Sequence, residues 1–353
     1  MLAMALKEFR QLRRDRRTVA LMIGLPLLLL VVFGYAASFD VSSLRAIALG
    51  PAAAQVASAA PRQLEVTAQY PDEDRADAVR RLRDGEANLA IVTGPRPAVL
   101  IDGSDLFAAK AAVGALGGRQ GLPAPEVLFN PDLKTSAMMV PALTGLILVF
   151  IGTVATSLGV VRERQSGTLE QLAVMPFRLR DVFVGKILPY FVVAAIDLAV
   201  IAAVGIALFD VPFRGSPWVL ALGDVEFLFV TLGIGVLIST VSQNQGQAIQ
   251  LALMTLLPQV MLSGMIFPLS SMPIGVRWIG YGLPLTYFIQ ISRGVMLRGA
   301  GIGALVLPLI FLGVLGVVVF TLSVARFRRD LAPAGERRHR SRPAAQPVGA
   351  GAR

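Results

Sequence analysis

The chain has 353 residues, of which 55% are hydrophobic and 16% are charged, whereas an average soluble domain has about 25% charged residues. This composition is typical of a membrane protein. The chain contains no cysteine, which excludes a disulfide framework and a thiolate metal site, and its one histidine, His339, lies in a polar tail where a lone metal ligand is not expected.

The net charge of +10 is concentrated in three short stretches. Residues 1–17, 162–186 and 326–353 carry net charges of +4, +2 and +6, so the rest of the chain is slightly acidic. Lys and Arg beside apolar spans are typical of cytoplasmic loops, because these residues bias the orientation of membrane insertion. The pattern therefore favours a multi-pass membrane protein and argues against nucleic-acid binding.

The N-terminal region predicts a membrane anchor. In residues 1–17 apolar side chains recur at helical spacing opposite basic ones, which predicts an amphipathic helix on the cytoplasmic membrane surface; a positively charged flank is the alternative. Residues 18–39 form the first apolar span. Its apolar core is longer than the roughly 7–15 residues of a signal peptide, so an uncleaved anchor is favoured over a cleaved one.

Charge-poor segments along the chain are long enough to cross a membrane, which takes about 20 helical residues. Six spans are predicted, at residues 18–39, 135–161, 181–209, 217–241, 246–267 and 299–325. An even number places both termini on one side. With the basic stretches inside, residues 162–180 and the tail 326–353 are cytoplasmic.

Residues 40–134 are expected to form a soluble α/β domain outside the cytoplasm. Their pattern alternates between strands and helices, which predicts a small sheet with helices packed on it. The expected strands are residues 44–50, 64–70, 87–94 and 98–104, and the expected helices are residues 72–85 and 105–118. Asp102 and Asp105 are interpreted as turn and helix-cap residues rather than metal ligands.

No phosphate-binding loop is visible in the sequence. Such a loop reads G-x-x-x-x-G-K-[ST], whereas the one Gly-Lys pair, Gly185-Lys186, is followed by isoleucine and lacks the upstream glycine. The third span contains a carboxylate, Asp197, which should face protein or water rather than lipid. It is interpreted either as a polar lining or proton-sensitive site, or as a hydrogen-bonded packing residue.

The most elaborate polar stretch, "VRERQSGTLEQLAVMPFRLRDVFVGK" (residues 161–186), lies between two spans. Thr168 followed three residues later by Gln171 is a capping box that begins a helix, and Pro176 ends it after two turns. A short capped helix between two long helices is a rigid element that could be presented to the cytoplasm. Periodicity alone leaves a solvated loop equally open.

The same stretch, read as "RERQSGTLEQLAVMPFRLRDVFVGKILPY", resembles the segment of ABC-2 type transporter permeases that forms a coupling helix on a separate ATP-binding subunit. "LPQVMLSGMIFPLSSMP" and "YGLPLTYFIQISRGVMLRG" resemble that family's fifth span and following segment. The resemblance implies that residues 268–298 dip into the outer leaflet as re-entrant helices, with Arg293 and Arg298 at headgroup level. It assigns ATPase coupling to Arg162, Glu163, Gly167, Thr168, Leu169, Glu170, Leu172 and Pro176.

In the family, permeases pair, and spans two and five line the route between them. The resemblance thereby places a set of residues near the route: Phe150, Thr153, Ser157, Met254, Met261 and Met265. The methionines would share one helical face, and the alternative interpretation is that they are core or lipid-facing residues. Small residues at Gly145, Gly152 and Gly159 should permit close helix packing within or between subunits.

The resemblance thus implies a mainly α membrane protein with six transmembrane helices and an α/β extracytoplasmic domain between the first two. It would be the permease of a bacterial inner-membrane exporter for an amphipathic or hydrophobic substrate. The chain would bind no cofactor or metal and would not be an enzyme, because ATP and Mg²⁺ belong to the partner ATPase. Further partners would be a second permease, identical or homologous, the lipid bilayer and, optionally, a periplasmic adaptor.

Two other functions remain open from the sequence. One is export of a lipid or lipid-linked glycan. The other is a membrane-anchored sensor whose outer domain binds a ligand, although the capped helix at Thr168 argues against it. An intramembrane enzyme is less favoured, because no paired acids or nucleophile–base set is expected within the spans.

Overall fold

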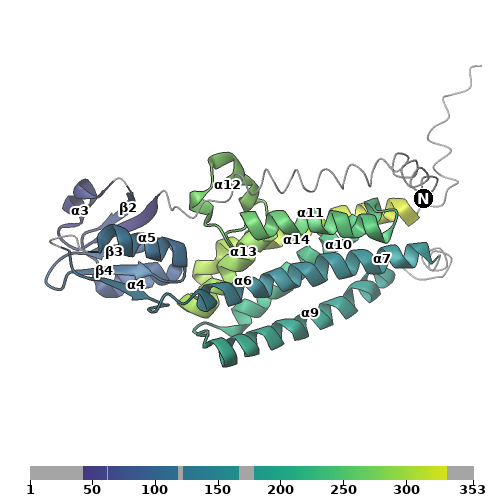
Figure 1. Cartoon of the computed structure of the whole chain (residues 1–353), viewed down its shortest axis with the longest axis horizontal. Helices are drawn as coiled ribbons and strands as arrows, with labels where there is room; N and C mark the ends of the chain where they lie inside the picture. The colour runs from purple at the N-terminus through teal and green to yellow at the C-terminus, as the bar shows by residue number, and fades with distance from the viewer. Residues whose placement is uncertain (1–42, 62, 118–121, 167–178, 332–353) are drawn as a thin grey trace, which may run out of the picture.

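The computed structural model describes residues 43–61, 63–117, 122–166 and 179–331. The predicted N-terminal helix and first span (residues 1–39), the capped helix that begins at Thr168 and most of the basic tail lie outside these described residues. Figure 1 shows two parts: an α/β domain at one end, and a bundle of long helices that extends away from it.

The α/β domain contains a five-stranded sheet in the order β2-β1-β3-β4-β5. All neighbouring strands are parallel except β3 and β4. The strands are β1 (Leu44–Leu49), β2 (Leu64–Tyr70), β3 (Leu89–Val92), β4 (Ala98–Asp102) and β5 (Pro125–Leu128), and the helices are α3 (Ala53–Ala59), α4 (Arg75–Asp84) and α5 (Leu106–Leu116). The expected α/β unit is confirmed, and the four expected strands and two expected helices are all present.

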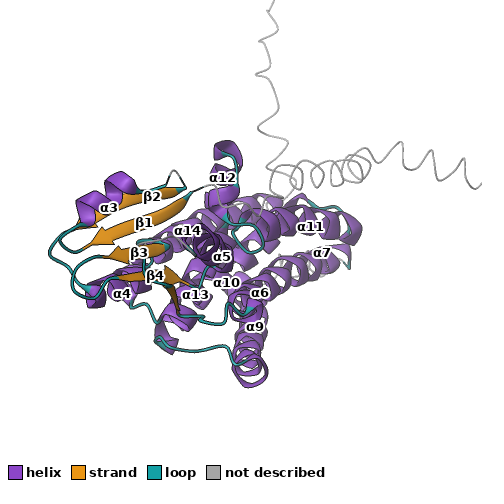
Figure 2. Ribbon diagram, turned by 60° about the vertical axis from the view of Figure 1, so that its left-hand side comes forward, coloured by secondary structure: helices purple, strands orange, loops and turns teal. Residues whose placement is uncertain are grey.

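Helices cover both faces of this sheet (Figure 2). Alternate side chains of the central strands form two cores, one with α5 and one with α4. Every residue of β3 and β4 is buried, as expected of central strands with helices on both sides. Helix α3 and strand β5 were not expected, because α3 has no side-chain cap and β5 is only four residues long and begins with a proline.

The helical part contains long helices joined by short turns. In chain order they are α6 (Thr135–Phe150), the π-helical turn η1 (Ile151–Ala155), α7 (Thr156–Gln165), α9 (Leu179–Phe209), α10 (Pro217–Val241), α11 (Gln245–Leu262), η2 (Leu269–Ser271), α12 (Ile274–Tyr281), α13 (Pro284–Arg293), η3 (Gly294–Arg298) and α14 (Ile302–Leu331). Helices α6, η1 and α7 form one continuous rod.

Four helices among the described residues are long and apolar enough to cross a membrane, at Thr135–Gln165, Phe191–Phe209, Pro217–Val241 and Ile302–Arg326. They correspond to four of the six predicted spans. Helix α11 lies at the fifth, but it has only 18 residues and several glutamines, and it is not among the four. The mainly helical architecture is confirmed, whereas the six-span count stays a prediction.

Helix α10 lies at the centre of the bundle and packs against α14, α13 and the α6–α7 rod. Phe227 stacks on Phe288 of α13 with 4.4 Å between the ring centroids. A Cβ on Gly145 would lie 2.5 Å from a ring carbon of Phe288, and one on Gly152 would clash with Thr231 of α10. The predicted close packing at these two glycines is therefore confirmed, and it occurs within the chain.

Candidate functional site

The end of α7 farthest from the α/β domain carries the first part of the predicted coupling segment, residues 162–180 (Figure 1). Arg162 is exposed and Glu163 is partly buried. The other predicted coupling residues, from Gly167 to Pro176, lie outside the described residues. Their role stays a prediction.

Arg164, which no sequence motif marks as functional, joins this end of α7 to the turn between α10 and α11. Its Nη1 donates hydrogen bonds to the carbonyl oxygens of Ser239 at 3.0 Å and Ser242 at 3.2 Å. Gln245 Nε2 adds a bond to Gln165 Oε1 at 3.0 Å. The last turn of a helix exposes carbonyls that lack intrahelical partners, and a guanidinium is well suited to satisfy them. These hydrogen bonds connect the end of α7 to the end of α10 and the start of α11.

The predicted route residues of the second span do not share one environment. Phe150 is 51% exposed, whereas Thr153 and Ser157 are fully buried. Gly235 of α10 lies against this rod, because a Cβ there would meet the carbonyl oxygen of Thr153 at 3.0 Å. Of the three, Phe150 alone presents its side chain on the outer surface of this chain.

The expectation that Met254, Met261 and Met265 share a helical face is wrong for Met265. Helix α11 ends at Leu262, and Gly264 has a φ of +85°, a left-handed conformation that favours glycine and ends helices. Met265 therefore lies in the following turn, where it is 2% exposed. Met261 is 6% exposed and Met254 is partly buried, so two of the three remain on α11.

Asp197 lies on α9, the helix at the edge of the bundle (Figure 1). Its side chain is partly buried, while the adjacent Ile196 is 58% exposed. The structure thus places Asp197 near the boundary between the packed and the open face of α9. Both interpretations of this residue remain predictions.

The arginines that follow α11 contact oxygens of the protein. Arg277 donates to the carbonyls of Ser270 and Met272 at 2.8 and 3.2 Å. Arg293 donates to the carbonyls of Met138, Gly264 and Met265, at 3.3, 3.4 and 3.4 Å, and so joins α6 to the turn after α11. The carbonyls of the protein thus bind its guanidinium, and the expected position of Arg293 at headgroup level stays a prediction.

Arg298 connects the two parts of the molecule. Its Nη1 lies 3.7 Å from Oδ2 of Asp102 at the end of β4, and the two side chains are 15% and 4% exposed. Gly85 allows this approach, since a Cβ there would lie 2.6 Å from the same nitrogen. Arg298 is thus largely covered by protein, and its expected position at headgroup level also stays a prediction.

Asp102 and Asp105 have the turn and cap roles that the sequence predicted. Asp102 Oδ1 accepts a hydrogen bond from the backbone N–H of Ser104 at 2.8 Å, and Asp105 caps α5 by accepting from the N–H of Ala108 at 3.2 Å. Burial raises the pKa of the Asp102 carboxyl, and the Arg298 guanidinium partly opposes this shift. Asp102 therefore has a second role at the domain contact, which its turn sequence does not reveal.

Two acidic residues of α10, Asp224 and Glu226, were not selected from the sequence. They lie within the predicted fourth span, residues 217–241. They are two positions apart, about 200° around the helix, so their carboxylates point to different faces and form no catalytic dyad. Asp224 is 2% exposed, and its Oδ1, like Oε2 of Glu226, is buried without a hydrogen-bond partner among the described residues.

No group of three or more His, Asp or Glu side chains is arranged to hold a metal ion in the part of the chain that the structure describes. The candidate features among the described residues are the Arg164 contact at one end, the Arg298–Asp102 contact at the other, and the acids of α10 between them.

Most of the chain is similar to known proteins. The family described as ABC-2 family transporter protein matches residues 16–325. The Escherichia coli (strain K12) protein named "Probable multidrug ABC transporter permease YbhS" is 30% identical over 371 residues, covering 93% of this chain and 97% of that protein. Two others from the same organism match over about half their length: "Probable multidrug ABC transporter permease YbhR" (30% over 203 residues, 58% and 55% covered) and "Inner membrane transport permease YhhJ" (31% over 213 residues, 58% and 54% covered).

Proposed function

Because the chain belongs to the ABC-2 family of transporter proteins, we propose that it is the membrane-spanning permease of an ATP-driven exporter whose ATPase is a separate subunit. The observation that carries the proposal is the near full-length similarity to a permease named for multidrug transport. The long apolar helices supply the membrane-spanning part that such a permease needs. The absence of a phosphate-binding loop from the sequence is the reason for proposing a partner that hydrolyses ATP.

In this proposal the ATPase binds the coupling segment, residues 162–180, at the cytoplasmic end of α7. The hydrogen bonds of Arg164 support a mechanical role, because they connect that end to the turn between α10 and α11. A displacement of the coupling segment would then move three helices together. The cargo is proposed to be hydrophobic or amphipathic, and two permeases together form the route.

The export function predicts ATP-dependent transport by the permease and its ATPase together. In inside-out vesicles that contain both subunits, we expect a hydrophobic dye to accumulate in the lumen when ATP is added, and we expect the ATPase to co-purify with the permease. Vesicles in which the ATPase cannot hydrolyse ATP are the control. If no ATP-binding subunit co-purifies and ATP drives no transport of any dye in a hydrophobic panel, the proposal is wrong.

The proposed orientation predicts which segments face the cytoplasm. A tag after Arg353 should be accessible only from the cytoplasm, and a tag inserted at Gly118 in the α/β domain should be accessible from outside, because Lys and Arg favour cytoplasmic loops. Protease digestion of intact, outer-membrane-permeabilised cells measures both. Cleavage of both tags, or of neither, would contradict the six-span topology.

A further inference from the structure

A groove on the outer surface of the bundle runs between α10 and α14 and has a volume of about 450 Å³. It is lined by one side chain of α10, Glu226, and by six residues of α14: Leu309, Ile310, Gly313, Val314, Val317 and Val318. Ile310, Val314 and Val317 are each more than half exposed. The wall is thus apolar and open on the side where a membrane-spanning helix meets lipid, and its single ionisable lining group is Glu226.

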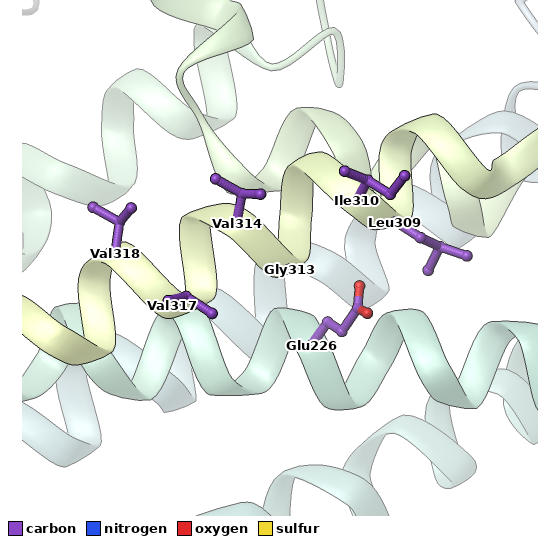
Figure 3. Close-up of a pocket in the computed structure, with 7 residues that line it drawn as sticks. All are labelled: Glu226, Leu309, Ile310, Gly313, Val314, Val317 and Val318. Carbon is purple, nitrogen blue, oxygen red and sulfur yellow. The ribbon is translucent and has the colours of Figure 1, made fainter.

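The carboxylate of Glu226 points from α10 towards α14, beside Gly313 (Figure 3). Its Oε2 is buried and has no hydrogen-bond partner among the described residues. Gly313 faces the carboxylate across the groove, since a Cβ there would lie 3.7 Å from Oε1. The described residues that line the groove include no Lys or Arg.

A lone carboxylate within a membrane-spanning helix is costly. On insertion scales an acid at the centre of a membrane-spanning helix costs about 2.5–3.5 kcal/mol, and such residues usually pair with another group. A lipid acyl chain in the groove would leave the carboxylate unpaired. A ligand with a positive centre and an apolar body would pair with the carboxylate and also make apolar contact with the valines.

We propose that this groove binds a lipophilic monocation, with the positive centre against Glu226 and the apolar body along α14 towards Val318. The wall from Leu309 to Val318 covers ten residues, or about 13 Å of helix from the first to the last, which suits a molecule with several rings or a short aliphatic tail. Asp224 takes no part, because its carboxylate lies on the buried face of α10. The proposal that the groove binds such cations does not depend on export, whereas their identification as cargo rests on the proposed function.

Tetraphenylphosphonium and tetraphenylborate test the proposal, because the two ions have nearly the same shape and opposite charge. With the full-length permease in lipid nanodiscs, we expect saturable binding of tetraphenylphosphonium at least about tenfold tighter than that of tetraphenylborate, a difference of about 1.4 kcal/mol. Glu226→Gln should remove this preference, and Glu226→Asp should retain part of it. Gly313→Leu should weaken binding of the cation, because its side chain would fill the space before the carboxylate.

Glu126→Gln, which changes an exposed carboxylate of the α/β domain, is the matched control and should bind as the unaltered protein does. A measurement on the unaltered protein avoids the risk that a variant misfolds. A hydrophobic carbodiimide should modify Glu226, as detected by mass spectrometry, and tetraphenylphosphonium should protect it while tetraphenylborate should not. Three results would each contradict the proposal and leave a groove that holds lipid only: equal binding of both ions, unchanged binding by Glu226→Gln, or no protection of Glu226. If export persists in that case, the exporter proposal is unaffected.

Discussion

Replacement of Arg298 by methionine is expected to destabilise the protein by about 3 kcal/mol, because it leaves the buried carboxylate of Asp102 without its cation. Methionine retains much of the apolar contact of the arginine side chain, so the loss is mainly electrostatic. The two residues belong to different parts of the molecule, α/β domain and helical bundle. We therefore expect the α/β domain of the variant to be cleaved more readily by protease, together with a lower midpoint of thermal unfolding.

The double variant Asp102→Leu/Arg298→Met should recover much of this loss, since an apolar pair can replace a buried ion pair at little cost. Arg80→Met is the matched control, because Arg80 forms an exposed pair with Asp77, and such pairs contribute about 0–1 kcal/mol. Equal effects of Arg298→Met and Arg80→Met would show that the domain contact does not depend on the Arg298–Asp102 pair.

The pH dependence of this variant follows from the buried carboxyl. Burial raises the pKa of Asp102 in the folded protein above its ordinary value of 3.8. A group with a raised folded pKa contributes stability below its unfolded pKa and loses that contribution as the pH rises through its folded pKa. Without Arg298 the pKa should rise further. The destabilisation by Arg298→Met should therefore shrink as the pH falls from about 7 towards 4, where the carboxyl becomes neutral.

Features of the fold that depend on local sequence could be predicted. The fourth span was expected at residues 217–241, and α10 has these bounds because a proline begins it and polar residues follow it. The strands of the α/β domain could be predicted because each is a short apolar run bounded by turn-forming residues, a pattern that extends over only a few positions. Asp105 was recognised as a cap for the same reason, since a cap is defined by its own residue and the next three.

Features that depend on tertiary packing could not be predicted. The sequence shows no acid beside Arg298, because its partner Asp102 is almost 200 positions away. Arg164 and Arg293 bind backbone carbonyls, which every residue carries and which leave no sequence pattern. The prediction that Met265 shares a helical face with Met254 and Met261 was wrong, because it assumed 3.6 residues per turn beyond Gly264, where the helix has already ended. Glu226 was missed because an acid inside an apolar run was counted as part of a span.

Most residues of the coupling assignment, from Gly167 to Pro176, lie outside the described part of the chain, and the assignment rests on the resemblance of residues 162–180 to the family's coupling helix. The described structure adds one argument. Arg164 connects the start of this segment to the bundle through hydrogen bonds to the carbonyls of Ser239 and Ser242. These bonds offer a path by which a displacement of the segment would reach α10. A change in the segment that weakens binding to the ATPase should therefore abolish transport without unfolding the permease.

Glu170→Arg is expected to lower ATP-driven transport by at least about tenfold, because reversal of a charge at an interface costs several kcal/mol and a tenfold loss needs only about 1.4. Thr168→Ala should act in the same direction but less strongly, since loss of a helix cap costs about 1 kcal/mol. Glu65→Arg, the same charge reversal at an exposed position of β2, is the control and should transport normally.

The measurements are co-purification of the ATPase, its ATP turnover in membranes, dye transport and the thermal midpoint of the permease. The thermal midpoint should not change in any of the three variants. Full partner binding and full transport by Glu170→Arg would show that residues 162–180 are a solvated loop, and the ATPase would then have to bind elsewhere on the chain.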